Sequence, residues 1–310
     1  QEFGEQIVKI LLTGATGFLG KNLMPILSEK YDVSGVGSTW DLRNQASCGE
    51  LLDKIEPDVV VHAAGSVGGI GANQENPGKF LYENLIMGAN LIEAARVREV
   101  GKFILLGTVC SYPKFANVPF KEPTIWKGYP EETNAPYGIA KKTLMKMVET
   151  YNWQYGFNGV NLIPVNMYGP HDHFNLTSSH VIPALILKFY NAMKAGDQTV
   201  ELWGTGEASR EFLFAPDCAE AIMLAIEKDV EPDPINIGTG KEITISGLAS
   251  EIAEQMGFDG EILYDSSKPD GQPRRCLDVS RAKELLGFVA KTDFKDGLKQ
   301  TIEWFLGEQK

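Results

Sequence analysis

The chain has 310 residues, enough for one large domain or two modest ones, and its 43% hydrophobic and 23% charged residues are typical of a globular protein. The formal net charge of −12 argues against general binding to nucleic acids or to anionic membranes. No apolar run approaches the roughly 20 residues that a membrane-spanning helix needs. The four cysteines are scattered without a Cys-x-x-Cys pair, so we expect reduced thiols and a cytoplasmic protein rather than a disulfide scaffold or a zinc site.

A glycine-rich turn follows the first predicted strand. Residues 7–12 are apolar except for Lys9, and three glycines spaced three apart follow within residues 13–20, ahead of an amphipathic helix. Glycines permit a tight turn and close approach of the backbone, and the start of the helix receives a pyrophosphate. The strand before and the helix after favour a dinucleotide-binding turn over a plain strand-to-helix turn. The residues expected to contact the cofactor here are Gly14, Thr16, Gly17, Phe18, Leu19 and Gly20.

The second predicted strand, 31–36, ends without an acidic residue. An acid at this place would grip the adenosine ribose hydroxyls of NAD, whereas Gly37, Ser38 and Thr39 leave room for a 2′-phosphate. The pattern favours NADP, with no arginine at the strand tip. We place Ser38, Asp41 and Leu42 at this end of the cofactor, although a loop with a helix cap is the plainer interpretation of the last two.

Further strands alternate with helices through the first half of the chain. A buried strand at 58–64 opens into a glycine-dense loop at 65–71, which approaches the nicotinamide or substrate with bare backbone or serves as a lid. Later strands are predicted at 103–106 and 160–165. The alternation predicts an α/β fold with a Rossmann-type doubly wound parallel sheet. Further cofactor contacts are expected from Ala63, Ala64, Pro164, Asn166 and Met167.

A cluster of reactive side chains follows the apolar run 103–106. Thr108 and Cys110 come directly after this predicted strand, and Tyr137 and Lys141 stand four apart, on one face of a predicted helix. In open α/β sheets, ligands bind beyond the carboxyl ends of the strands. An ammonium beside a phenol favours the phenolate, so we expect Lys141 to lower the pKa of Tyr137. Hydroxyl, phenol and ammonium together predict a site for proton and hydride transfer.

After Asn166 the pattern changes to short mixed elements. We expect an NADP-binding domain at 1–166 with a return segment at about 215–240, and a smaller mixed α/β substrate-binding domain at 167–310. Metal ligation by the histidines at 171 and 173 is not expected, because their spacing suggests no further ligands. Candidates for a nucleotide diphosphate, or alternatively ordinary solvated charges, are Lys188, Arg210, Lys268 and Arg274.

The chain resembles the extended short-chain dehydrogenase/reductases that act on nucleotide sugars, over nearly its whole length. The residues that carry the resemblance are Gly14, Gly17, Gly20, Tyr137, Lys141, Cys110 and the stretches 67–70, 112–114, 179–185, 203–206, 210–213 and 268–274. Within that family it is similar to the epimerase-reductases of GDP-linked 4-keto sugars. Three departures are Thr108 where the family has serine, Ser66 where it has lysine, and Leu187 with Lys188 where it has an arginine pair.

The resemblance implies an NADP(H)-dependent enzyme with a GDP-linked substrate. Lys141 would also bond the nicotinamide ribose, and His180 would contact the cofactor. Cys110 and His180 would be the base and the acid beside the ketone, with a buried core cysteine as the plain alternative. Helices at 80–97 and 136–155 would pair two subunits into a homodimer. Substrate contacts would come from Asn166, Val181, Lys188, Trp203, Arg210, Lys268 and Asp270.

Four alternatives remain open at this point. The first two are an enzyme that only epimerises and an enzyme that only reduces, each acting on another sugar such as a GDP-heptose. A non-catalytic dinucleotide-binding protein would keep the fold but has no need of the intact set Thr108, Cys110, Tyr137 and Lys141. The fourth alternative is a redox-sensing role for Cys110.

Overall fold

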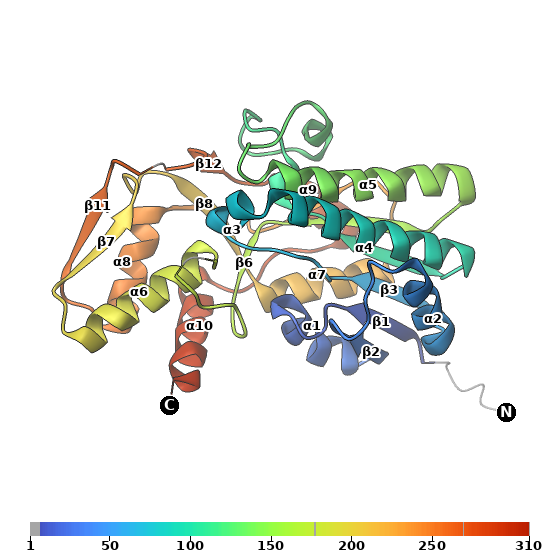
Figure 1. Cartoon of the computed structure of the whole chain (residues 1–310), viewed down its shortest axis with the longest axis horizontal. Helices are drawn as coiled ribbons and strands as arrows, with labels where there is room; N and C mark the ends of the chain where they lie inside the picture. Colours follow the sequence, from blue (N-terminus) through green and yellow to red (C-terminus); the bar gives the residue numbers. More distant parts are fainter. Residues whose placement is uncertain (1–6, 177, 269, 310) are drawn as a thin grey trace.

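A six-stranded parallel sheet forms the centre of the larger part of the molecule (Figure 1). The computed structural model describes residues 7–176, 178–268 and 270–309, so Pro269 of the predicted basic stretch lies outside the described residues. The strands follow the order β2-β1-β3-β4-β5-β9. Their bounds are β1 Lys9–Thr13, β2 Asp32–Val36, β3 Val59–His62, β4 Lys102–Leu106, β5 Gly159–Pro164 and β9 Ile235–Ile237. The predicted doubly wound parallel sheet is confirmed.

The strand order reverses between β1 and β3, and this switch positions the site. Thr13 pairs with His62, and His62 pairs with Leu105, so the carboxyl ends of β1, β3 and β4 lie level with one another. Ligands of open α/β sheets bind in the crevice outside such a switch point. The predicted glycine turn follows β1, at this edge.

Helices cover both faces of this sheet. Helix α1 (Phe18–Ser28) contacts α7 (Ala215–Glu227) on one face, and α4 (Pro77–Val97) lies between α2 (Gln45–Ile55) and α5 (Ala135–Tyr155) on the other. Gly88 permits the close approach of α4 and α5, because a Cβ atom there would lie 2.3 Å from a methyl carbon of Leu144. Short helices complete this part: α3 Ile70–Glu75, η1 Val109–Ser111, η2 Glu122–Trp126 and α9 Ser280–Leu286.

The second half of the chain adds a smaller mixed unit. Strand β8 (Ser209–Phe214) is its centre, pairing with β6 (Asn166–Tyr168), β10 (Glu242–Thr244) and β12 (Arg274–Arg275). A separate parallel pair joins β7 (Thr199–Trp203) to β11 (Glu261–Asp265). Three helices pack beside these strands: α6 Val181–Ala195, α8 Ile245–Met256 and α10 Phe294–Glu308. None of the helices in the described ranges is long and apolar enough to span a bilayer.

Two clusters of buried apolar side chains hold the molecule together. The second cluster gathers side chains such as Phe189, Leu248 and Phe305 from α6, α8 and α10. The first surrounds the large sheet and includes α7 and β9 as well as Leu277 and Phe288, which come from late in the chain. The chain therefore passes between the two cores more than once before it ends.

Candidate functional site

The turn after β1 requires glycine at positions 14 and 20. Gly14 has φ +74°, and a Cβ atom on it would lie 2.7 Å from the backbone nitrogen of Ala64. A Cβ atom on Gly20 would lie 2.1 Å from the carbonyl oxygen of Gly14. Helix α1 begins after Gly17 without a side-chain cap, so N–H groups at its start are left for an anionic ligand.

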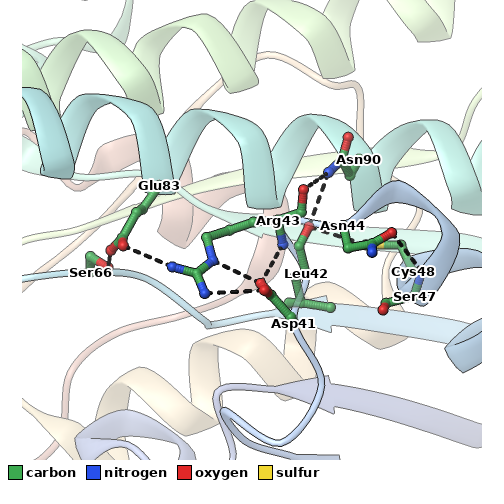
Figure 2. A network of polar contacts seen from close by, with 9 residues as sticks. All are labelled: Asp41, Leu42, Arg43, Asn44, Ser47, Cys48, Ser66, Glu83 and Asn90. Carbon is green, nitrogen blue, oxygen red and sulfur yellow. Dashed lines mark hydrogen bonds and ion pairs between the residues drawn. The ribbon is translucent and has the colours of Figure 1, made fainter.

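A polar network holds the loop after β2 at the predicted adenosine end of the site (Figure 2). The Asp41 carboxylate accepts hydrogen bonds from the Arg43 backbone N, Nε and Nη2 at 3.0, 2.8 and 3.1 Å. These bonds lower the pKa of Asp41. Arg43 also donates from Nη1 to Glu83 at 3.1 Å, and Glu83 accepts from the Ser66 hydroxyl. Asp41 is thus engaged by an arginine, and Ser66, where the family has lysine, is paired with α4.

Leu42 is a core residue of the same loop. Its side chain is buried, and its carbonyl oxygen accepts bonds from Cys48 Sγ at 3.3 Å and Asn90 Nδ2 at 3.1 Å. Asn44 caps α2 by accepting from the backbone N–H of Ala46 at 2.9 Å. Leu42 therefore offers a ligand only its backbone, whereas the predicted contacts Thr16, Ser38 and Asp41 are exposed.

The ends of β1 and β3 are fixed by a buried pair that the sequence analysis did not identify. Thr13 Oγ1 lies 2.9 Å from His62 Nδ1 and accepts a hydrogen bond from the Ala64 N–H at 3.3 Å. Burial, and then the charge of Lys141, lowers the pKa of His62 to about 3. The imidazole is therefore neutral at physiological pH, and it positions the predicted cofactor residues Ala63 and Ala64.

Tyr137 extends from α5 to Thr108, and Lys141 on the same helix lies near His62 and Gly65. Lys141 is 4% exposed, and desolvation lowers its pKa to about 8. Burial and the neighbouring Cys110 raise the pKa of Tyr137, while a hydrogen bond with Thr108 opposes this rise. Our expectation that Lys141 lowers the Tyr137 pKa is wrong for this structure, because desolvation of the phenolate is the largest effect.

A glycine places α5 against the loop after β4. A Cβ atom on Gly138 would lie 2.3 Å from the carbonyl oxygen of Cys110, and Ser111 Oγ donates a hydrogen bond to the Gly138 carbonyl at 2.8 Å. The glycine follows Tyr137 directly. Its missing side chain therefore brings the phenol next to Thr108 and Cys110.

Cys110 is half-buried beside a buried arginine. Its N–H donates to Thr108 Oγ1 at 3.2 Å, and Arg275 Nη1 donates to its Sγ at 3.7 Å. His180 is the N-cap residue of α6 and is exposed. The protein around it and the charge of Arg275 lower its pKa, so it is neutral more readily than a free histidine. Arg275 thus contacts Cys110, and its charge acts on His180, although the sequence analysis missed it.

Arg274, the residue before Arg275, has a different environment. Arg274, which we expected at a diphosphate, forms an exposed ion pair with Glu242, and this pair lowers the pKa of Glu242. Successive side chains of a strand point to opposite faces, so in β12 Arg274 points away when Arg275 points inward. In this structure Arg274 is therefore paired with a carboxylate, and its role at a diphosphate stays a prediction.

Arg210 lies beside Arg275 across the paired strands β8 and β12. It donates to the Ser209 carbonyl at 2.7 Å and to the Asp270 carbonyl at 3.3 Å. Burial and then the like charge of Arg275 lower its pKa to about 10. The Asp270 carboxylate accepts from the Thr205 N–H and hydroxyl at 2.7 and 2.9 Å, so both of its oxygens hold the neighbouring loop.

The remaining predicted substrate residues lie on the smaller unit. Lys188 donates to the carbonyl oxygen of Glu201 at 2.7 Å, two residues before Trp203. Trp203 is 68% exposed, and Lys268 Nζ lies 5.8 Å from the centroid of its ring. Val181 is the first residue of α6. An exposed aromatic face with cations around it suits a nucleotide base and its phosphates.

Pro164, Asn166 and Met167 line the crossover from the large sheet to β8. Pro164 ends β5, and the other two begin β6. Asn166 donates from Nδ2 to the Glu211 carbonyl at 3.1 Å. Among the residues that the structure describes, no group of three or more ligating side chains is placed to hold a metal ion. Asp172, which stands between the two histidines at 171 and 173, has its pKa raised to about 7 by burial.

Comparison with known proteins adds the family. The model of the NAD dependent epimerase/dehydratase family matches residues 10–238. The chain belongs to this family. A GDP-L-fucose synthase of Escherichia coli is 38% identical over 313 residues, which cover 97% of this chain and 97% of that protein.

Solved structures of the epimerase/dehydratase family agree. A GDP-L-fucose synthetase from Naegleria fowleri bound to NADP has a TM-score of 0.89 and 29% identity, covering 98% of this chain and 96% of that one. A GDP-mannoheptose C4 reductase from Campylobacter jejuni with NADP bound has a TM-score of 0.87 and 29% identity, covering 98% and 100%.

Proposed function

We propose that this chain is an NADP-dependent epimerase-reductase that converts GDP-4-keto-6-deoxy-D-mannose to GDP-L-fucose, or that acts on a related GDP-4-keto sugar. The observation that carries the proposal is the meeting of Thr108, Cys110 and Tyr137 at the carboxyl end of β4. Arg275 borders Cys110 and affects His180, which links that residue to the same place.

The glycine turn fits a dinucleotide. Cβ atoms would collide with the backbone at Gly14 and Gly20, so the glycines let the backbone come close to the start of α1. The N–H groups at the start of this helix suit a pyrophosphate. NADPH, when bound, supplies the hydride for the ketone. No acid competes with a 2′-phosphate beyond β2, because Asp41 is neutralised by Arg43.

The acid–base groups suit epimerisation. A carbonyl acidifies the adjacent C–H bonds, and removal of the proton needs a base and a site for the developing oxyanion. We assign the base to Cys110 and reprotonation to His180. The hydroxyls of Thr108 and Tyr137 would bond the enolate oxygen.

The same pocket serves reduction. Tyr137 would donate its proton to the oxygen at carbon 4, and its raised pKa keeps the phenol protonated for that step. Lys141, buried one helical turn away, would bond the nicotinamide ribose. We assign substrate binding to Asn166, Val181, Lys188, Trp203, Arg210, Lys268 and Asp270.

A second candidate is a C4 reductase of a GDP-heptose, or an enzyme that only epimerises. The similarity to a heptose reductase of 29% identity and TM-score 0.87 favours the former. Ser66 and Leu187 stand where the family has charged residues near the expected sugar. Ser66 is uncharged, and its hydroxyl donates a hydrogen bond to Glu83. These departures concern the sugar and not the chemistry.

We also propose a cytoplasmic homodimer with an NADP-binding domain at 1–166 and a substrate-binding domain at 167–310. All four cysteines are free, which agrees with a reducing compartment. Helices α4 and α5 carry exposed apolar side chains, among them Tyr82 at 59% and Trp153 at 70%. A two-fold axis would bury both in a four-helix interface.

The test is to incubate the protein with NADPH and GDP-4-keto-6-deoxymannose and to determine the stereochemistry of the product. GDP-L-fucose supports the full proposal. A product reduced at carbon 4 without inversion at carbons 3 and 5 would establish the reductase alternative. No consumption of NADPH with this substrate or with a GDP-4-keto-heptose would exclude both.

A further inference from the structure

Arg275 is a buried cation without a carboxylate partner among the described residues. Arg275 is the last residue of β12 and is 9% exposed. Nε and Nη2 donate to Gln272 Oε1 at 3.3 and 3.1 Å, and Nη1 donates to Cys110 Sγ at 3.7 Å. The cysteine sulfur is therefore a direct partner of the guanidinium.

Gln272 holds the other edge of this guanidinium. It is also 9% exposed, and its Nε2 donates to the carbonyl oxygen of Lys114 at 2.8 Å. Lys114 lies four residues after Cys110, so the glutamine, the arginine and the cysteine loop form one connected unit. The chain fixes where the guanidinium points before any ligand arrives.

The charges around Arg275 favour an anion at the sulfur. A buried charge is costly unless it is paired, and a neutral thiol offers only a weak acceptor. Arg210, on the adjacent strand, adds a like charge whose effect appears as a lowered Arg210 pKa. Asp270 and Glu131 act on Arg210 in the opposite direction, but the direct neighbour of Arg275 is the sulfur of Cys110.

We propose that Arg275 is a positioning residue that stabilises the thiolate form of Cys110. The inference rests on the proposed function, in which this thiolate takes a proton from a ring carbon beside the ketone. The electrons of that C–H bond move to the carbonyl oxygen and form an enolate, and the sulfur becomes a thiol. The Arg275 guanidinium compensates a charge on the sulfur only while the sulfur is an anion.

Cys110 is well suited to a direct test, because the other three cysteines are buried. The rate of alkylation by iodoacetamide, at neutral pH and without substrate, reports the thiolate fraction of Cys110. We expect Arg275→Gln to slow alkylation by about tenfold or more, and Arg275→Lys to restore most of the rate. Arg274→Gln is the matched control, since that neighbour is exposed and paired with Glu242, and it should leave the rate unchanged.

Two further readouts separate this role from phosphate binding. Deuterium uptake from heavy water at carbons 3 and 5 should fall in Arg275→Gln, while the dissociation constant for GDP should stay within about twofold. An unchanged alkylation rate in Arg275→Gln, or a weakened GDP affinity with normal alkylation, would overturn the proposal.

If Arg275→Gln does not fold, Gln272→Leu is the second variant, because it keeps the charge of Arg275 but removes the side chain that orients the guanidinium. It should also slow alkylation of Cys110. An unchanged rate in Gln272→Leu would overturn the proposal equally. Slowed alkylation beside a wild type that takes up no deuterium would support the Arg275–thiolate contact and reject only the proposed epimerisation.

Discussion

Gly138 lies so close to Cys110 that a Cβ atom on the glycine would be 2.3 Å from the cysteine carbonyl oxygen. This contact sets the distance between α5, which carries Tyr137, and the loop that carries Thr108. The glycine is therefore as much a part of the catalytic geometry as the residues that act.

We expect Gly138→Ala to lower kcat/KM by about 10²-fold, because α5 must move away and reacting groups tolerate misplacement of about 1 Å poorly. Gly307→Ala is the control, since a Cβ atom there has open space. Steady-state kinetics and thermal unfolding of both variants would check this. Unimpaired kinetics in Gly138→Ala would mean that the contact relaxes without moving the phenol.

Hydride transfer and epimerisation should separate by mutation. Tyr137→Phe keeps the ring but loses the proton, so NADPH oxidation should fall by about 10²–10⁴ while cofactor binding survives. Cys110→Ser should abolish deuterium uptake beside the ketone and leave reduction of the unepimerised ketone possible. His180→Asn should keep the first proton removal and give faulty reprotonation. Full deuterium uptake at both carbons in Cys110→Ser would remove the thiol from the mechanism.

Lys141 should destabilise the fold in the absence of cofactor. Its pKa falls from an ordinary 10.5 to about 8, a difference worth about 3 kcal/mol. Below pH 8 the lysine is charged in both states, so the full cost is present; above it the folded lysine loses its proton and the cost shrinks. Lys141→Met should therefore raise the free energy of unfolding at pH 7 by up to this amount, with a smaller gain near pH 10. Denaturant titrations at both pH values would test this, and a destabilised variant at pH 7 would contradict it.

The cofactor preference should depend on Arg43. The wild type should bind NADPH more tightly than NADH in fluorescence titrations. Arg43→Gln leaves the carboxylates of Asp41 and Glu83 uncompensated near the expected 2′-phosphate, so its NADPH affinity should fall by roughly two- to fivefold, with less effect on NADH. Equal or tighter NADH binding by the wild type would refute the preference.

The dimer is tested by mass. Light scattering at micromolar protein should give twice the 34.1 kDa of the chain. Introducing charge on the exposed faces of α4 and α5, as in Tyr82→Arg with Trp153→Glu, should shift the mass toward the monomer. A monomer mass for the wild type at all concentrations would exclude this assembly.

The large sheet and its glycine turn were predictable because their signals are local. Apolar runs of strand length alternate with helical spacing, and the glycine spacing reflects the positive φ of Gly14 and the contact of Gly20 with the Gly14 carbonyl, both of which are local. The place of Thr108 and Cys110 at a ligand-binding edge followed from the fold class, since ligands of open α/β sheets bind beyond the carboxyl ends of the strands.

What the sequence did not predict depends on registers and burial. Which of Arg274 and Arg275 points inward is decided by a two-residue strand, β12, that leaves no periodicity to interpret. The direction of the Tyr137 pKa depends on how much water the surrounding protein excludes, which spacing on a helix does not reveal. The pairing of Asp41 with Arg43 is a matter of side-chain geometry in a loop.

The late return of Leu277 and Phe288 to the first core has a consequence for synthesis. A ribosome that has released only the first 166 residues has made most of the sheet, but β5 still lacks its neighbour β9, and part of the core is still missing. The nascent chain must therefore wait for nearly its whole length before the larger unit closes. The two units should mature together rather than one after the other. A truncation that removes residues from 277 onward would therefore destabilise the larger unit as well as the smaller one.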